Sequence, residues 1–200
     1  LGYIVSLVSG KSFEEYLRKE VFAPLEMKDT TFFPNKEQEK RLVRLVKRKG
    51  NKLVDVTDTK EDTQEFLRHG AYRYEAGCGG LYGTITDYEH MARMLCSNGM
   101  YQGKQFLRPE TVCLMHTEAQ KHLEPEPGFT WGLSVKIRQN PELSGSYAHK
   151  GTYGWSGAFG THFFVCPDEK LEAVFMTNRS DLGGSGSYIS EKVEELVFGS

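Results

Sequence analysis

The fold is decided by one stretch of the chain, FGTHFFVCPDEKLEAVFMT, which spans residues 159–177. Two runs rich in β-branched and aromatic residues, 159–166 and 171–177, flank the sequence Pro-Asp-Glu-Lys. The flanking residues are typical of strands, whereas the four residues between them are typical of a turn. The stretch therefore predicts two antiparallel strands joined as a hairpin.

Further structure is predicted on both sides of this hairpin. Apolar and polar residues alternate from 129 to 137, which predicts a third, half-buried strand. From about Tyr188 onward, apolar residues recur on one stripe of a helix, which predicts a closing helix laid on the sheet. Residues 121–200 are therefore expected to form three antiparallel strands and a C-terminal helix.

The preceding residues, 1–120, are predicted to be mostly helical. Apolar residues recur at helical spacing within 3–8, and Gly10 suits the left-handed conformation that ends a helix. Ser12 and Thr86 each have a glutamate three residues later, which is the capping-box spacing at a helix start. Helices followed by antiparallel strands and a closing helix indicate an α+β fold.

A charged segment, residues 30–70, interrupts the helical part. Lys and Arg cluster within 41–52, but acidic residues are interleaved on both sides, which favours a solvated, irregular insertion over a nucleic-acid patch. The net charge of −2 also argues against attraction to nucleic acid or an anionic membrane. No apolar run approaches the roughly 20 residues that a membrane-spanning helix needs.

Cysteine and histidine spacing gives no support for a metal or a cofactor. The cysteines at 78, 96, 113 and 166 form no C-x-x-C pair, and the six histidines, 69, 90, 116, 122, 149 and 162, show no metal-binding spacing. We therefore expect no cofactor and no metal. Free thiols slightly favour a reducing, cytoplasmic compartment, but the sequence leaves localisation undetermined.

Three stretches, taken in order, resemble the serine β-lactamase-like family, which includes class C β-lactamases, penicillin-binding proteins and esterases. They are VSGKSFEEYL with PLEMKDT inside residues 1–30, GGLYGT at 79–84, and HKG with GAFGT at 149–161. The resemblance covers residues 1–30, 77–115 and 129–198 and leaves out the charged insertion. It implies a β-lactamase/transpeptidase-like fold, here incomplete, with part of the helical subdomain.

The resemblance also implies where the active site lies. The family builds it from Ser-x-x-Lys, from Tyr-x-Asn, and from Lys-Thr-Gly or His-x-Gly on a strand. The first two motifs are absent from this chain, and the third is matched by His149-Lys150-Gly151. It implies an oxyanion donor at the backbone of Thr152, close approach of substrate at Gly151, and His149 beside the substrate. On a strand, Lys150 would face the opposite side; His149 is alternatively an ordinary strand histidine.

Two neighbouring features remain open to more than one interpretation. Tyr153 and Trp155 form either an aromatic wall of an acyl pocket or part of the core. The sequence GWSGA at 154–158 nearly spells the G-x-S-x-G nucleophile elbow. It ends in alanine and precedes a strand where the elbow requires a helix, so we expect a loop.

Together these features predict the C-terminal fragment of a serine hydrolase that cleaves amides or esters through an acyl-serine intermediate. The chain opens at Leu1 directly into a helical pattern without a cap, as a cut helix would, and we expect it to be inactive alone. The alternative is a non-catalytic binding or interaction module on the same scaffold. The expected partners are a small acyl substrate (ester, β-lactam or peptide) and either the missing N-terminal part or a second copy.

Overall fold

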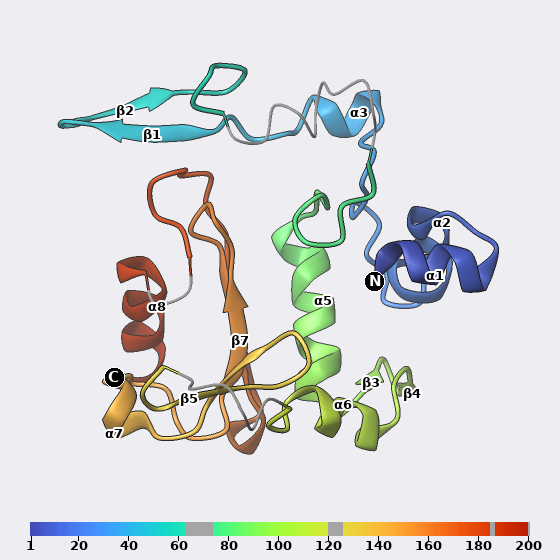
Figure 1. The fold of residues 1–200 in the computed structure, drawn as a ribbon, viewed down its shortest axis with the longest axis vertical. Coiled ribbons are helices and arrows are strands. Elements are labelled where there is room, and N and C mark those ends of the chain that lie inside the picture. The colour runs from blue at the N-terminus through green and yellow to red at the C-terminus, as the bar shows by residue number, and fades with distance from the viewer. Residues whose placement is uncertain (63–73, 120–125, 185–186, 200) are drawn as a thin grey trace. The chain divides into compact units, whose positions relative to one another are not determined.

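The structure is a computed structural model that describes residues 1–62, 74–119, 126–184 and 187–199 (Figure 1). It divides into two compact units, Leu1–His90 and Met91–Ser200. Helices and antiparallel sheets are both present, which confirms the predicted α+β class. The boundary predicted between residues 120 and 121 lies outside the described residues and stays a prediction.

The first unit consists of short helices and one hairpin. Its elements are α1 (Gly2–Ser9), α2 (Phe13–Leu17), η1 (Arg18–Phe22), α3 (Lys36–Glu39), β1 (Val46–Lys49), β2 (Lys52–Asp55) and the beginning of α5 (Ile85–Cys96). Gly10 ends α1 with φ 69°, and the Ser12 hydroxyl accepts the Glu15 N–H at the start of α2, as predicted. The expected cap at Thr86 is wrong, because α5 begins at Ile85 and its cap is Thr84, whose Oγ1 accepts the Asp87 N–H at 3.1 Å.

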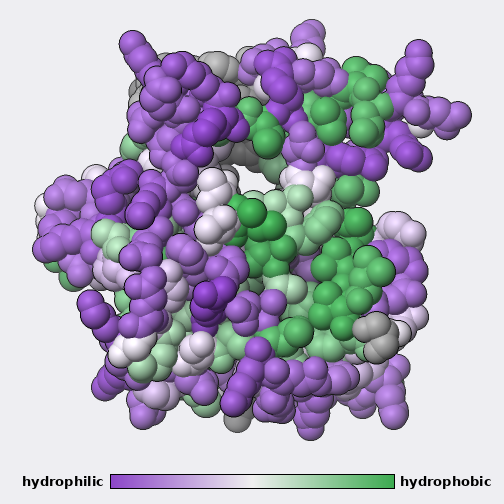
Figure 2. Space-filling model, turned by 180° about the vertical axis from the view of Figure 1, so that it is seen from behind, coloured by the Kyte–Doolittle hydropathy of each residue, from purple (hydrophilic) through white to green (hydrophobic). Residues whose placement is uncertain are grey.

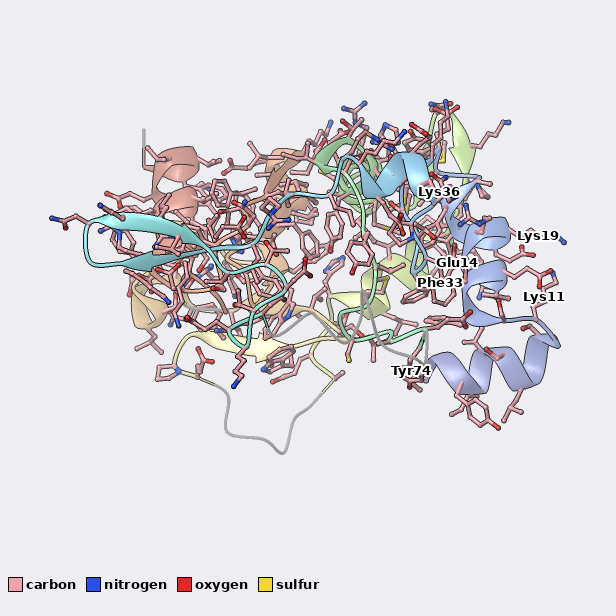
Figure 3. All side chains as sticks on the ribbon, turned by 90° about the horizontal axis from the view of Figure 1, so that it is seen from above. Lys11, Glu14, Lys19, Phe33, Lys36 and Tyr74 are labelled. Carbon is pink, nitrogen blue, oxygen red and sulfur yellow. The ribbon has the colours of Figure 1, made fainter. Side chains whose placement is uncertain are left out.

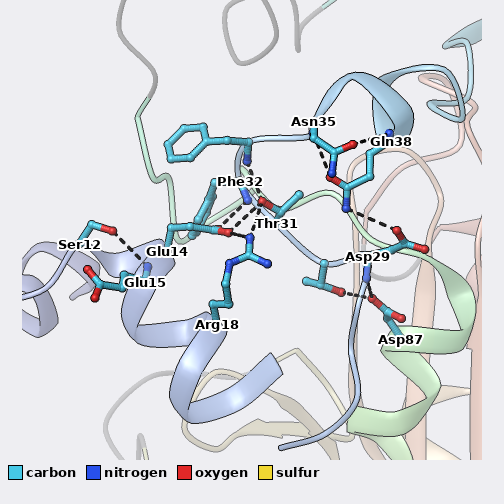
Figure 4. Close-up of polar contacts among 12 residues, drawn as sticks. Ser12, Glu14, Glu15, Arg18, Asp29, Thr31, Phe32, Asn35, Gln38 and Asp87 are labelled. Atoms are coloured by element: carbon cyan, nitrogen blue, oxygen red, sulfur yellow. Dashed lines mark hydrogen bonds and ion pairs between the residues drawn. The ribbon is translucent and has the colours of Figure 1, made fainter. Parts of the chain in front are cut away.

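A buried carboxylate joins α2 to the following segment. The Glu14 side chain accepts hydrogen bonds from Thr31 Oγ1 at 2.8 Å and from the Phe32 N–H at 2.9 Å, and it pairs with Arg18 (Figure 4). Lys19, by contrast, projects away from the helices (Figure 3). Buried carboxylates need such partners, so Glu14 fixes the entry of this segment into the core of the unit.

The charged insertion is more regular than predicted. Within it, β1 and β2 form an antiparallel hairpin with Val46 opposite Asp55 and Lys49 opposite Lys52. Exposed ion pairs lie along it, including Arg44 with Asp55 at 2.7 Å and Lys47 with Glu61 at 3.1 Å. The rest of the predicted insertion, residues 63–70, lies outside the described residues.

The second unit is built around a five-stranded sheet. Its elements are the end of α5, β3 (Met100–Tyr101), β4 (Lys104–Gln105), α6 (Pro109–Met115), β5 (Phe129–Trp131), β6 (Lys136–Arg138), α7 (Pro141–Ser144), β7 (Tyr153–Ser156), β8 (His162–Cys166), η2 (Pro167–Glu169), β9 (Leu171–Phe175) and α8 (Tyr188–Phe198). The sheet is antiparallel with order β5-β6-β7-β8-β9. The predicted β8–β9 hairpin and closing helix are confirmed.

The prediction of three strands is wrong, because the sheet has two more among the described residues. The expected single strand over 129–137 is two strands, β5 and β6, that pair antiparallel. The chain turns between them, where the Gly132 N–H donates to the Val135 carbonyl and Ser134 adopts φ 72°. Alternation of apolar and polar residues cannot reveal such a turn, because it continues through both strands of a tight hairpin.

Part of the core of this unit lies between the sheet and α8, and buried residues of α5 and α6, among them Met94 and Val112, form another part. Phe164 on β8 is buried and its ring contacts Phe198 on α8, with centroids 5.3 Å apart. Strand β9 pairs with β8 alone, so it forms an edge of the described sheet. Among the described residues, none of the helices has the length and apolar character to cross a membrane.

Candidate functional site

A cavity of about 640 Å³ lies within the second unit, between one face of the sheet and α7 and α8. Strands β5 to β8 contribute residues to its wall. Three of the predicted site residues line it, namely Thr152, Tyr153 and Trp155, whereas His149 and Gly151 do not. Its size is that of a small-molecule site.

The cavity wall contains a chain of buried polar side chains that the sequence did not reveal. Ser156 Oγ lies 2.8 Å from His162 Nδ1, and His162 Nε2 lies 3.3 Å from Glu194 Oε1, a contact without the alignment of a full hydrogen bond. The other carboxylate oxygen of Glu194 accepts from Arg138 Nη2 at 2.6 Å and from Ser146 Oγ at 2.8 Å. The chain thus links β7, β8, β6 and α8 through one carboxylate.

The electrostatics of this chain keep the carboxylate charged. Burial raises the pKa of Glu194, but contact with His162 and the charge of Arg138 outweigh it, so the pKa lies below its ordinary value. Burial lowers the pKa of Arg138, and the Glu194 charge opposes that change. Removing one member of such a buried pair is destabilising, because it leaves the other charge buried without a partner.

Ser156 stands on a strand, so the prediction that 154–158 forms a loop is wrong for 154–156. Ser156 is paired with His162 across the β7–β8 ladder, which places both side chains on the face that α8 covers. The only feature of the sequence that pointed to this contact was the six-residue separation of Ser156 and His162 across a glycine-rich turn. Glu194 and Arg138 come from distant positions and gave no signal.

The predicted third motif lies in a turn. His149, Lys150 and Gly151 precede β7, and Gly151 has φ 86°, so the expectation that they lie on a strand with alternating faces is wrong. The Thr152 N–H donates to the His149 carbonyl at 3.1 Å and closes this turn. Of the four residues in this turn, Thr152 lines the cavity, and His149, Lys150 and Gly151 do not.

Two aromatic contacts separate the roles of Tyr153 and Trp155. Tyr153 is fully buried, its ring stacks on His116 with centroids 4.6 Å apart, and burial raises the pKa of its hydroxyl. Trp155 is 40% exposed and contacts Trp131 with centroids 4.8 Å apart. Of the two residues, Tyr153 belongs to the core and Trp155 is available to a ligand.

A second cluster lies apart from the cavity lining. His149 Nδ1 contacts the carboxylate of Glu169, and His149, Cys166 and Glu169 bring one ligand atom each within 4.8 Å of one another. Residues of these three types ligate metals, although their spacing in the sequence matches no metal motif. His69 and His122 lie outside the described residues.

The fold and the strand-lined cavity define a protein of the β-lactamase/transpeptidase-like class. The Beta-lactamase family profile matches residues 1–197, so this chain belongs to the Beta-lactamase family. A putative carboxypeptidase and an esterase are among the relatives that it matches, and a penicillin-binding protein homologue is among the solved structures with this fold.

Individual relatives are distant. An uncharacterized protein of Mycobacterium tuberculosis is 26% identical over 197 residues, which cover 88% of this chain and 46% of that protein. A putative D-alanyl-D-alanine carboxypeptidase of Escherichia coli K12 is 24% identical over 90% of this chain and 43% of its own. The structure of EstCE1, a hydrolase with promiscuous acyltransferase activity, has a TM-score of 0.80 at 21% identity and covers 98% of this chain and 53% of that one. The chain therefore spans about half the length of the relatives it matches.

Proposed function

We propose that this chain supplies the strand wall of the active site of a serine hydrolase that cleaves amide or ester bonds through an acyl-serine intermediate. The observation that carries the proposal is the pairing of β7. Strand β6 pairs with β7 at Tyr153 and Gly154, and the register stops there, whereas β8 pairs with all four residues of β7. Among the residues that the structure describes, no strand pairs with the other edge of β7 at Trp155 and Ser156, and this edge lies beside the cavity.

A free strand edge offers the chemistry that acyl transfer requires. The Gly157 N–H donates to the Thr161 carbonyl of the β7–β8 hairpin at 2.8 Å, so alternation turns the Ser156 N–H toward the free edge. A backbone N–H held rigidly at that edge stabilises the developing oxyanion without reorienting. Thr152, the donor first predicted, already uses its N–H within the turn. The buried Ser156, His162 and Glu194 chain would hold the edge in place.

In this proposal, Trp155 forms an apolar wall for the acyl group and Tyr153 supports the strand from the core. The predicted contact of His149 with a substrate carboxylate, and the predicted close approach of substrate at Gly151, stay predictions. No serine in these 200 residues has a lysine three positions later, so the nucleophile and its base would come from sequence outside this chain. The substrate class is an ester, a β-lactam or a peptide.

The test uses the complete protein and this chain in parallel. A fluorescent penicillin and a fluorophosphonate should label the complete protein at a serine outside residues 1–200, and should not label this chain. Trp155→Ala should lower kcat/KM for a nitrophenyl ester at least tenfold, whereas Leu133→Ala, an exposed apolar residue of the same unit, should not. Labelling of a serine within this chain, or full activity of Trp155→Ala, would contradict the proposal. No labelling of the complete protein would favour the non-catalytic module.

Uncovered apolar surface supports a further part of the proposal, that the chain binds either the rest of its own fold or a second copy. Helix α1 has no buried residue; Tyr3 is 72% and Val8 84% exposed. Apolar side chains gather in continuous areas of the surface seen in Figure 2. Within the described part of the chain, β9 is an edge strand, and such an edge is a template for another strand. Light scattering should show an assembly larger than a monomer at micromolar concentration; a compact monomer that binds no hydrophobic dye would contradict this.

A further inference from the structure

We propose that His149, Cys166 and Glu169 form a binding site for a divalent transition-metal ion, with Zn²⁺ preferred. One ligand atom of each residue lies within 4.8 Å of the other two. The three residues belong to the second unit and none of them lines the cavity. The site is therefore separate from the proposed acyl pocket.

The backbone places two of the ligands side by side. Cys166 ends β8, and Glu169 ends the 3-10 helix η2 that follows it directly. Cys166 caps η2 with extended backbone, φ −113° and ψ 93°, and the single turn of η2 brings the Glu169 carboxylate within 4.8 Å of its thiol. Pro167 fixes the first turn, and Lys170, with φ 54°, ends it.

The third ligand comes from the turn before β7. The His149 carbonyl accepts the Thr152 N–H, which anchors the backbone, and the His149 ring packs against Phe198 with centroids 5.1 Å apart. Nδ1 of the ring already contacts the Glu169 carboxylate. Two ligands from distant parts of the chain therefore meet without any rearrangement of the backbone.

The donor set matches Zn²⁺ in type and in charge. Thiolate and imidazole favour zinc over Mg²⁺ or Ca²⁺, which take oxygen ligands. One thiolate, one carboxylate and a neutral imidazole balance the two charges of the ion, so the ion and its three ligands together carry no net charge. A neutral complex suits the burial of Cys166, because burying an unbalanced charge is costly. Tetrahedral zinc would hold these atoms about 3.3 to 3.6 Å apart, and a fourth position remains for water.

The remaining adjustment of about 1 Å, judged against those zinc geometries, falls on mobile side chains. His149 is 56% exposed and Glu169 42% exposed, so both can rotate toward the fixed thiol of Cys166. Cys166 is a free thiol that makes no disulfide.

The test is a titration of Co²⁺ into the chelator-treated protein. At one equivalent we expect a thiolate-to-cobalt charge-transfer absorption in the near ultraviolet, which Zn²⁺ then displaces. Cys166→Ser should abolish this absorption, and His149→Ala and Glu169→Gln should each weaken Co²⁺ affinity at least tenfold. Cys113→Ser, which removes an exposed thiol of the same unit, and Lys150→Ala should leave both unchanged.

Three results would overturn the proposal. They are no charge-transfer absorption at one equivalent, an absorption that survives Cys166→Ser, and wild-type affinity in both His149→Ala and Glu169→Gln. Because Cys166 is buried, Cys166→Ser could also unfold the sheet, and thermal unfolding of the variant checks this. The two exposed variants, His149→Ala and Glu169→Gln, decide the question in that case.

Discussion

The hairpin β1–β2 and the sheet β5–β9 both carry ion pairs, but the pairs differ in burial. Arg44 and Asp55 lie exposed at the hairpin, where their hydrogen bond lowers the pKa of Asp55 to about 2. Arg138 and Glu194 lie buried between the sheet and α8, each less than 10% exposed. Water screens the first pair much more strongly than the second. Two ion pairs with similar atoms at similar distances should therefore differ in how much stability is lost when one partner is removed.

The largest effect is expected at Glu194. Glu194→Ala leaves Arg138 buried without its partner and Ser146 without its acceptor, which should lower the free energy of unfolding by about 3 to 5 kcal/mol. Urea denaturation measures the change. Glu195→Ala, on the next position of the same helix, removes a half-exposed pair with Lys192 and serves as the control. Equal midpoints for the two variants would show that burial does not separate the pairs.

A second buried carboxylate, Glu14, tests whether the loss of stability depends on burial or on which unit the carboxylate belongs to. Glu14 lies in the same unit as the exposed hairpin but accepts hydrogen bonds from Thr31 and Phe32 inside the core. Glu14→Ala should lower the free energy of unfolding by about 1.5 to 3 kcal/mol, the range for hydrogen bonds to a charged group. Glu15→Ala is the exposed neighbour, and a change as large as that of Glu14→Ala would break the comparison.

A smaller, pH-dependent effect is expected at His116, which stacks on the buried Tyr153 ring. Burial lowers the pKa of His116 below 6.5, although a backbone hydrogen bond opposes the change. The unfolded chain then binds more protons, so stability falls as pH decreases from 6.5 through the lowered folded pKa. His116→Phe keeps the ring stack and removes the titrating group. The midpoint temperature of thermal unfolding should therefore depend less on pH in this window. An unchanged slope would contradict the assignment.

The smallest effect is expected at the hairpin. Arg44→Ala removes the exposed pair with Asp55 and should leave the midpoint of thermal unfolding unchanged within error, with or without added salt. Lys47→Ala should behave in the same way. A clear loss of stability in either variant would mean that the exposed pairs act as a network.

Local patterns in the sequence were sufficient for several elements. Gly10 ends α1 and Ser12 begins α2, as predicted, because the left-handed turn and the hydroxyl cap depend on neighbouring residues only. The β8–β9 hairpin followed from two apolar runs around Pro167–Lys170. The turn between β5 and β6 was missed, because alternation is the same in one strand as in two strands of a tight hairpin.

The site shows the same division. The sequence alone determined the α+β class and the family resemblance, because helix periodicity, strand alternation and motif order are local properties of the chain. Only the tertiary structure brought His162 and Glu194 to Ser156, and His149 to Cys166 and Glu169. These contacts depend on strand register and on where α8 and η2 pack, which are set by burial of the whole core and not by the spacing of the residues involved.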